Sequence, residues 1–296
     1  MTGRPPVPVV TVNFNAGDAL LACARSVLAS SAPVELVVVD NGSTDGSLPR
    51  LREAWGSDPR LRVLEAGRNL GFARATNRGL AETGGEYALL LNPDCTIGPD
   101  TVERMREVMD AHPGAGLAGC LVRNPDGTEQ AGCRRRIPTP GLAFGRAFGL
   151  SSLTGADRDF VLAGTPLPPG PADVEAISGA FMFVRRSALA AVGPLDEGYF
   201  LHCEDLDWCL RFRRAGHRVL FVPGVAVVHE KGRSSRDRPV RVLWHMHRGM
   251  VRFYRKFFRT AYPAPVMWAV FAGIGVRFAA LAVRAALSRA AGPRGA

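Results

Sequence analysis

The sequence predicts an α/β protein with a mostly parallel central sheet that carries helices on both faces. Across residues 7–111, short apolar runs rich in β-branched residues alternate with segments of helical periodicity, the pattern of βα repeats. Several of these runs end in polar turn residues, and ligands bind beyond the carboxyl ends of such strands. With 296 residues, of which 47% are hydrophobic and 22% charged, the chain can bury a large core.

The first half of the chain supplies four strand and helix pairs. Apolar runs predict strands over residues 7–14, 34–39, 61–65 and 87–91. Spacings of three and four between apolar residues predict helices over residues 18–30, 48–55, 72–82 and 101–111. We expect Asp100 to cap the last of these helices and Pro113 and Gly114 to end it.

The second half begins with an irregular segment and then resumes the alternation. Residues 134–171 are rich in Gly, Pro and Arg and predict a long loop, and such loops in compact domains usually serve function. After the loop, the pattern predicts strands over residues 176–184, 218–222 and 225–229, and helices over 187–192 and 204–215.

Charge and cysteine usage limit the partners and the compartment. The formal net charge is +10, but 14 Lys/Arg and one Asp fall after Glu230, so the rest of the chain carries −3. The body of the chain contains no basic stretch interleaved with aromatic residues, so we expect no nucleic acid partner. The six cysteines form no metal-type pairing, and no apolar signal segment precedes residue 7, which together predict reduced thiols in the cytoplasm.

The first candidate site follows the strand that ends at Val39. Asp40-Asn41-Gly42-Ser43 is an ordinary tight turn in most proteins, but a carboxylate at a strand end can also accept a hydrogen bond from a nucleobase or a ribose. No G-x-G-x-x-G follows a strand and no Walker A loop is present, which disfavours nicotinamide, flavin and P-loop enzymes.

The second candidate site is a divalent cation site. Asp94 follows a strand in the sequence Asn92-Pro93-Asp94, which is either a simple turn or a carboxylate aimed at Mg²⁺ or Mn²⁺ on a diphosphate. His229 also ends a predicted strand. A lone histidine there is usually structural, but beside Asp94 it becomes a plausible ligand for Mn²⁺.

The third candidate site is the acidic start of the helix 204–215. Glu204, Asp205 and Asp207 would stabilise the positive end of a helix in any protein. They also follow the aromatic segment Gly198-Tyr199-Phe200, and a carboxylate at a helix start in a cleft can act as general base toward a sugar hydroxyl.

Together these motifs resemble the inverting family-2 glycosyltransferases, most closely the rhamnosyltransferase-type members. Each motif is weak alone, and their order and spacing over residues 9–235 carry the resemblance. The matching segments are Val-Asn-Phe-Asn at 12–15, Val-Asp-Asn-Gly-Ser-Thr-Asp-Gly-Ser at 39–47, Asn-Leu-Gly-Phe-Ala-Arg-Ala-Thr-Asn-Arg-Gly at 69–79, Asn-Pro-Asp at 92–94, Ser-Gly-Ala-Phe-Met at 178–182, Gly-Pro-Leu-Asp-Glu-Gly-Tyr-Phe at 193–200 and Glu-Asp-Leu-Asp-Trp-Cys at 204–209.

The resemblance implies a GT-A fold and a role for each matching residue. The residues it assigns to nucleotide binding are Asn13, Asn15, Asp40, Gly42, Ser43, Gly71, Arg74 and Asn77. It places Gly179 and Ala180 at the donor sugar, makes Asp205 the catalytic base with Glu204 as second choice, and gives Asp94 and His229 to Mn²⁺ or Mg²⁺. Asn92 replaces the first Asp of the family's Asp-x-Asp motif, which implies a weakly held metal.

The same resemblance implies the reaction and its partners. A nucleoside-diphosphate sugar would donate its sugar to an acceptor hydroxyl with inversion in a single displacement, in the assembly of cell-surface polysaccharide or glycolipid. The donor is dTDP-rhamnose by likeness, with UDP-sugars open, and the acceptor is a saccharide, a lipid-linked saccharide or a small aglycone. We expect the carboxylates of Asp40, Asp94 and Asp205 and the imidazole of His229 to converge on one cleft.

The domain organisation follows from these motifs. Residues 1–235 are expected to form the transferase domain, with a nucleotide-binding half of about 1–115 and an acceptor half of about 116–235. Residues 236–296 form a basic, apolar, helical extension. Because Arg277 and Arg284 interrupt the apolar run 266–287, we expect an interfacial amphipathic helix with a polybasic lead-in on the inner face of the plasma membrane. A helix packed on the enzyme's own body is the alternative.

Other functions fit the sequence less well. A sugar-nucleotide nucleotidyltransferase usually has a Gly-rich basic loop after its first strand, where this chain has Asn-Phe-Asn-Ala-Gly-Asp at 13–18. A non-catalytic binding protein with the same fold would not need Asp94, Asp205 and His229 together. A processive synthase is disfavoured because its Gln-x-x-Arg-Trp motif is missing.

Overall fold

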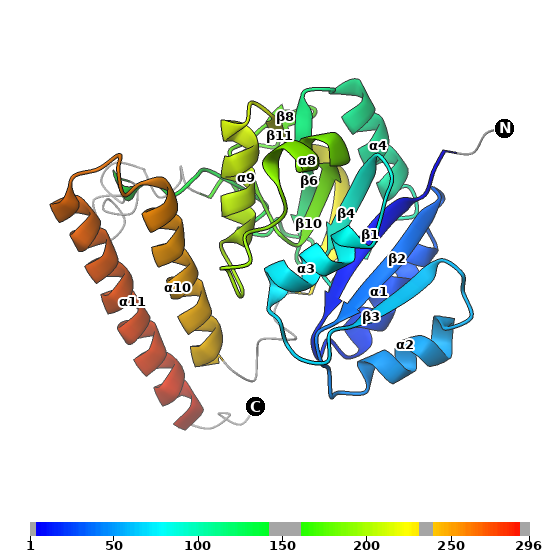
Figure 1. Ribbon diagram of the computed structural model, residues 1–296, viewed down its shortest axis with the longest axis horizontal. Coiled ribbons are helices and arrows are strands. Elements are labelled where there is room, and N and C mark those ends of the chain that lie inside the picture. Colours follow the sequence, from blue (N-terminus) through cyan, green and yellow to red (C-terminus); the bar gives the residue numbers. More distant parts are fainter. Residues whose placement is uncertain (1–3, 142–160, 231–238, 291–296) are drawn as a thin grey trace.

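The computed structural model describes residues 4–141, 161–230 and 239–290, which form an α/β body and two C-terminal helices (Figure 1). The strands of the main sheet are β1 Val7–Asn13, β2 Val34–Asp40, β3 Leu61–Glu65, β4 Tyr87–Leu91, β5 Cys95–Ile97, β6 Ala115–Arg123, β8 Ala172–Asp173, β10 Phe181–Arg185 and β11 Arg218–His229. Eight of them run side by side in the order β3-β2-β1-β4-β10-β6-β11-β5, and β8 pairs with β11. A separate two-stranded sheet joins β7 Arg134–Arg135 to β9 Ala176–Ile177.

The sheet is mostly parallel, as the sequence predicts. The register shows β1, β2, β3, β4, β6 and β11 running in one direction, while β5, β8 and β10 run against them. The parallel pairs among β1, β2, β3 and β4 come from the βα repeats of the first half. Of the antiparallel strands, β8 and β10 follow these repeats, and β5 lies between β4 and α4.

Helices cover both faces of the sheet. The helices are α1 Asp18–Leu28, α2 Ser47–Trp55, α3 Phe72–Ala81, α4 Thr101–Ala111, α8 Arg186–Val192, α9 Glu204–Arg214, α10 Pro239–Phe257 and α11 Ala264–Ala290. Successive strand residues point to opposite faces. Val9 therefore belongs to a core shared with α1, α2 and α4, while Val10 belongs to a second core shared with α3, α8 and α9.

The strand order creates a switch point between β1 and β4. From β1 the chain moves outward through β2 to β3, and it then crosses back by α3 to place β4 on the other side of β1. Where strand order reverses in this way, a crevice opens outside the carboxyl ends of the two strands. Asn13 ends β1 and Leu91 ends β4, so the polar residues that follow both strands meet at this crevice.

Four details differ from the sequence prediction. Strands β5, β6, β7 and β8 were not predicted; β6 is rich in Gly and Ala, which pack closely here but carry little strand preference. The predicted strand 176–184 is broken at 178–180 into β9 and β10. The two predicted strands 218–222 and 225–229 form one strand with a register shift after Val222. Asp100 does not cap α4, since its carboxylate faces Arg104 instead.

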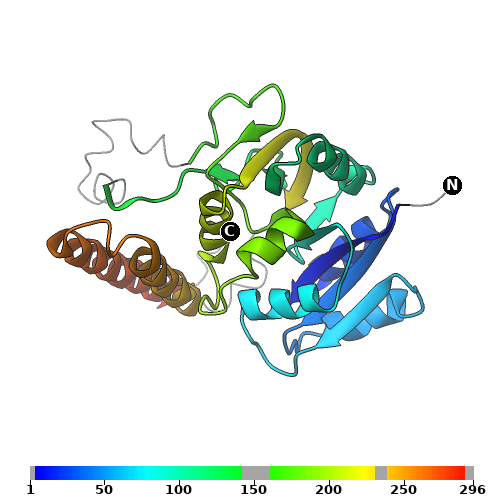
Figure 2. The ribbon, with the colours of Figure 1, turned by 45° about the horizontal axis from the view of Figure 1, so that its top comes forward.

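The two C-terminal helices lie against each other beside the body, as Figures 1 and 2 both show. Phe253 and Phe257 of α10 join the core that α9 covers, so α10 is packed on the body of the protein. Met267, Val270 and Ile274 of α11 pack on α10. The polybasic segment predicted to lead toward a membrane is therefore partly a packed helix, in agreement with the alternative stated above.

Candidate active site

A cleft of about 260 Å³ lies beyond the carboxyl ends of β1 and β4. Its walls come from the ends of β1 and β4, the turn after β2, the loops before α3 and α9, the end of β11 and the start of α10. The lining residues are Val12, Phe14, Asn41, Asn69, Gly71, Phe72, Asn92, Pro93, Asp94, Phe200, Leu201, His202, His229, Arg241, Val242 and His245. The topology thus places a largely apolar pocket with a few polar groups at the switch point.

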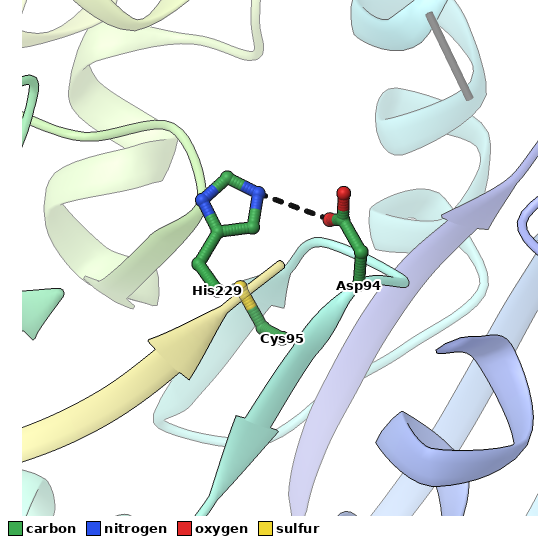
Figure 3. A group of neighbouring side chains, drawn as sticks. All are labelled: Asp94, Cys95 and His229. Atoms are coloured by element: carbon green, nitrogen blue, oxygen red, sulfur yellow. Dashed lines mark ion pairs between the residues drawn. The ribbon is translucent and has the colours of Figure 1, made fainter. Parts of the chain in front are cut away.

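Asp94 and His229 face each other in this cleft. The Nε2 atom of His229 lies 3.0 Å from Oδ1 of Asp94, and both side chains are buried (Figure 3). The end of β11 pairs with β5 so that His229 lies opposite Cys95, the residue after Asp94, and the Glu230 N–H donates to the Asp94 carbonyl. The short strand β5 is therefore what brings the two side chains together.

Gln130 determines which nitrogen of His229 carries the proton. Its Nε2 donates to the His229 carbonyl at 2.9 Å, which leaves its Oε1 to face His229 Nδ1 at 2.9 Å. Because Oε1 can only accept, Nδ1 must carry a hydrogen. In the neutral ring, Nε2 is then an unprotonated acceptor that points at a carboxylate oxygen.

This arrangement fits a divalent cation. Two acceptor atoms 3.0 Å apart repel unless a proton or a metal ion lies between them. Adjacent ligands of an octahedral Mg²⁺, each about 2.1 Å from the ion, would lie about 3.0 Å apart. An imidazole whose other nitrogen is held by an amide oxygen is the usual form of a metal-ligating histidine. Asp94 and His229 thus provide two ligands and leave the remaining positions for substrate oxygens and water.

Cys95 lies close to this pair but does not fit as a ligand. Its sulfur is within 4.8 Å of the ligand atoms of Asp94 and His229. Burial, together with the Asp94 charge, raises the pKa of the Cys95 thiol well above its ordinary value, and the thiol donates to the Ala180 carbonyl. Mg²⁺ and Mn²⁺ prefer oxygen ligands to a soft thiolate, so we interpret Cys95 as a packed side chain and not as a ligand of such an ion.

Asp205 and Glu204 begin α9, next to the cleft but outside its lining residues. The Asp205 Oδ2 atom accepts from Arg135 Nη2 at 2.5 Å and from the Gly179 N–H at 3.2 Å. Burial acts to raise the pKa of the Asp205 carboxyl, but the charge and hydrogen bond of Arg135 outweigh it and hold that pKa below its ordinary value. Asp205 is therefore ionised at neutral pH.

Glu204 has the opposite electrostatic character. Burial and the charge of Asp205 raise the pKa of Glu204 to about 8. Its Oε2 atom is buried and has no hydrogen-bond partner among the described residues. Two adjacent carboxyl groups thus differ in protonation at neutral pH because only one of them is paired with Arg135.

The segment Ser178–Ala180 connects Asp205 to the metal-type pair, by which we mean Asp94 and His229. The Gly179 N–H binds Asp205, and the Ala180 carbonyl accepts from the Asn92 N–H at 2.9 Å. A Cβ atom on Gly179 would lie 3.3 Å from the Asp205 Cβ, so this position suits a residue without a side chain. These contacts of the Gly179 N–H and the Ala180 carbonyl lie in the gap between β9 and β10, where the chain does not form a continuous strand.

Contrary to expectation, Asp40 does not line the cleft. Its Oδ1 accepts from Asn13 Nδ2 at 2.8 Å, and its Oδ2 accepts from the N–H groups of Gly42 and Ser43. Asn15 is likewise occupied, since its Oδ1 accepts from the Thr44 N–H. These residues hold the loops after β1 and β2 together, and Asn41 is the residue of the β2 turn that faces the cleft.

Arg74 and Asn77 also lie outside the cleft. Arg74 Nε donates to Glu197 at 2.9 Å, and Asn77 exchanges hydrogen bonds with the backbone of Leu195. The two side chains fasten α3 to the segment before α9. Of the residues assigned to nucleotide binding, only Gly71 lines the cleft. It has φ +86°, and a Cβ atom there would lie 2.7 Å from the Phe200 carbonyl.

Several residues of the site were not predicted from the sequence. Gln130 and Arg135 orient His229 and Asp205, but neither lies in a motif. Asn41 and Asn69 stand inside quoted motifs, and their side chains link the β2 turn to the loop before α3. Arg241 and His245 belong to α10, which was expected to be an appendage. Only the two asparagines gave a signal that could have been used.

Comparison with known proteins relates this chain to glycosyltransferases. Residues 9–164 match the family model described as glycosyl transferase family 2, and residues 88–288 match glycosyl transferase family group 2. The chain is 30% identical over 297 residues to the N-acetylglucosaminyl-diphospho-decaprenol L-rhamnosyltransferase of Mycobacterium tuberculosis, covering 96% of this chain and 94% of that protein. It is 28% identical to rhamnosyltransferase WbbL of Escherichia coli over 54% of this chain and 59% of that one.

Solved structures share the fold. The mannosyltransferase PcManGT of Pyrobaculum calidifontis, in complex with GDP-Man and Mn²⁺, matches with a TM-score of 0.61 and 19% identity, over 100% of this chain and 77% of that one. S. aureus TarS in complex with UDP-GlcNAc matches with a TM-score of 0.57 and 16% identity, over 92% of this chain and 73% of that one. The predicted GT-A fold is confirmed by these likenesses.

Proposed function

This chain belongs to glycosyl transferase family 2, and we propose that it transfers a sugar from a nucleoside diphosphate to an acceptor hydroxyl with inversion at the anomeric carbon. The observation that carries the proposal is the pair Asp94–His229, held 3.0 Å apart at the switch point of the sheet with the histidine tautomer set by Gln130. A divalent cation held at such a place could bind the diphosphate of a nucleotide sugar, because Mg²⁺ is usually bound by one or two carboxylates together with substrate phosphates.

The residues of the site would divide the work. Asp94 and His229 would hold Mn²⁺ or Mg²⁺, which when bound supplies positive charge to the oxygens of the departing diphosphate. Asp205 would take the proton from the acceptor hydroxyl as that oxygen bonds to the anomeric carbon. The bond from this carbon to the diphosphate breaks in the same step, and the nucleoside diphosphate leaves with the electron pair. One displacement inverts the configuration, and no protein nucleophile is required.

Asp205 is preferred to Glu204 as the base because a base must be ionised before it acts. Arg135 lowers the pKa of Asp205, whereas burial raises that of Glu204 to about 8. Asp205 also accepts a hydrogen bond from the N–H of Gly179, which lies in the segment that the family resemblance assigns to the donor sugar. Glu204 remains the second choice.

We propose dTDP-rhamnose as the donor and a lipid-linked saccharide as the acceptor. The support is the likeness over nearly the whole chain to a rhamnosyltransferase whose acceptor is named as N-acetylglucosaminyl-diphospho-decaprenol. A product of this kind serves in the assembly of cell-surface polysaccharide. The proposed location is the cytoplasm, at the inner face of the plasma membrane.

We propose that α11 provides contact with that membrane. Residues 264–287 are long and apolar enough to cross a bilayer. Four large apolar side chains on α11 are more than half exposed: Trp268, Val276, Val283 and Leu287. On a helical projection these four share one side, opposite to Met267 and Ile274, which pack on α10, while Arg277 and Arg284 flank the apolar side. This pattern suits a helix lying in the interface with its arginines at the headgroups.

The proposed function is tested with purified full-length protein, a panel of sugar nucleotides and an acceptor analogue that carries N-acetylglucosamine on a prenyl diphosphate. We expect release of nucleoside diphosphate and an inverted glycoside, with loss of both in EDTA and in Asp94→Ala. Release of pyrophosphate from a nucleoside triphosphate and a sugar phosphate would instead indicate a nucleotidyltransferase. Binding of the nucleotide sugar without any turnover would indicate a binding protein.

A further inference from the structure

Helix α10 forms part of the candidate active site. Arg241, Val242 and His245, near its start, line the same cleft as Asp94 and His229. The His245 ring stacks on the Phe200 ring with a centroid distance of 4.2 Å and an interplanar angle of 22°. The wall of the cleft is therefore completed by a segment that lies beyond the residues expected to form the transferase domain.

The position of α10 is fixed by contacts along its length. A Cβ atom on Gly249 would lie 2.8 Å from the His202 carbonyl, so the helix approaches the loop before α9 as closely as a glycine permits. Lys256 Nζ lies 2.7 Å from both Asp196 Oδ2 and Asp207 Oδ2, and the Asp207 side chain is fully buried. Arg211 pairs with the other oxygen of Asp207, and loss of Lys256 would leave Oδ2 of this buried carboxylate without its cation, so these pairs favour the docked position of the helix.

Arg241 is a cation of the cleft that forms no ion pair with the residues the structure describes. Among the lining residues that the structure describes, it is the only Arg or Lys. None of the described residues accepts a hydrogen bond from its guanidinium or pairs with it as a carboxylate, and the residue is exposed. By contrast, Arg252 and Lys256 on the same helix form ion pairs with Asp196. A guanidinium with free donors is well suited to two oxygens of a phosphate group.

A diphosphate also carries more negative charge than one divalent cation neutralises. The metal-type pair contributes the Asp94 charge to the same cleft, so a further cation would be needed to balance a bound diphosphate. Arg241 could supply it, because it lines the same cleft as Asp94 and His229, the residues that would hold the metal.

We propose that Arg241 binds the diphosphate group of a substrate in this cleft. The inference rests on the proposed function, which places a diphosphate there, and it extends the site to α10. Two substrates of the reaction carry that group: the nucleotide sugar donor and a diphosphate-linked acceptor.

The test compares Arg241→Ala with Arg248→Ala in the full-length protein. Arg248 is exposed on the same helix and does not line the cleft, so it controls for the loss of a positive charge. Thermal unfolding of both variants should match the wild type, which shows that α10 stays docked. If Arg241 contacts the donor, calorimetric titrations with pyrophosphate and with dTDP, each in Mn²⁺, should show about tenfold or greater loss of affinity for Arg241→Ala alone.

A second arm identifies the substrate. If Arg241 contacts the acceptor, its variant should keep dTDP affinity but show a raised KM for a prenyl diphosphate acceptor and an unchanged KM for the matching methyl glycoside. Equal behaviour of the two variants in every titration and in both KM values would overturn the inference. If the wild type transfers sugar but the two variants behave alike, only the role of Arg241 is contradicted. If the wild type binds pyrophosphate through Arg241 but transfers no sugar, only the proposed function is contradicted.

Discussion

Replacing Gln130 by leucine tests how His229 is prepared for a metal. The substitution keeps most of the side-chain volume but removes two hydrogen bonds of 2.9 Å, one to His229 Nδ1 and one to its carbonyl. Loss of such an outer contact typically lowers metal affinity 10- to 100-fold, or by about 1.4–2.7 kcal/mol. The buried donor and acceptor left without partners should also lower the free energy of unfolding by about 2–4 kcal/mol.

The assay is calorimetric titration of Mn²⁺ in the presence of a saturating nucleoside diphosphate, with thermal unfolding of the same samples. Gln130→Glu is the matched control: it retains an oxygen that accepts from Nδ1 but loses the donor to the His229 carbonyl, so it should keep metal affinity near that of the wild type while lowering the free energy of unfolding. If Gln130→Leu binds Mn²⁺ within about twofold of the wild type while still folded, the argument that Gln130 sets the tautomer of a metal ligand is wrong.

Three further predictions concern the carboxyl groups and α11. Asp205→Asn should lower turnover by about 100-fold or more and leave donor affinity nearly unchanged, as removal of a general base does; steady-state kinetics with turnover near the wild-type value would move the role elsewhere. The pKa of Glu204 rises from 4.5 to about 8 on folding, so between these pH values the folded state retains a proton that the unfolded state releases. The free energy of unfolding should therefore fall as pH rises through this window, by at most about 1.4 kcal/mol per pH unit. Glu204→Gln should flatten that slope in denaturant titrations from pH 5 to pH 9, and an unchanged slope would contradict the burial argument. Trp268→Ser should weaken co-sedimentation with anionic vesicles several-fold, whereas Leu167→Ser, exposed elsewhere on the protein, should not; equal binding of both would separate α11 from the membrane.

Local patterns were enough to predict the regular part of the fold. The apolar runs that became β1 to β4 and the helical periodicity of α1 to α4 follow the core-facing side of each element, so their bounds agree within a few residues. Strand β6 was missed because its Gly and Ala residues are selected by close packing, such as that of Gly119 against Ile177, and not by strand preference.

The candidate site was predicted where it depends on chain order and missed where it depends on contacts. Asp94 and His229 follow strands, so topology alone could bring them to one edge. Chain order could not show that Asn13 and the turn N–H groups hydrogen-bond the Asp40 carboxylate, so the position of Asp40 outside the cleft lining was not predicted. Gln130 reaches His229 from 99 residues away through a pairing of strands that no local pattern encodes.

The central claim is that Asp94 and His229 hold a divalent cation that binds the diphosphate of a nucleotide sugar. Its most direct test is the affinity of wild type, Asp94→Ala and His229→Ala for dTDP, measured by calorimetry with Mn²⁺ and again in EDTA. The account predicts that the wild type binds dTDP at least about tenfold more tightly with Mn²⁺ than in EDTA and that either substitution abolishes this difference. Affinity that is the same in all three proteins, with or without the metal, would contradict it.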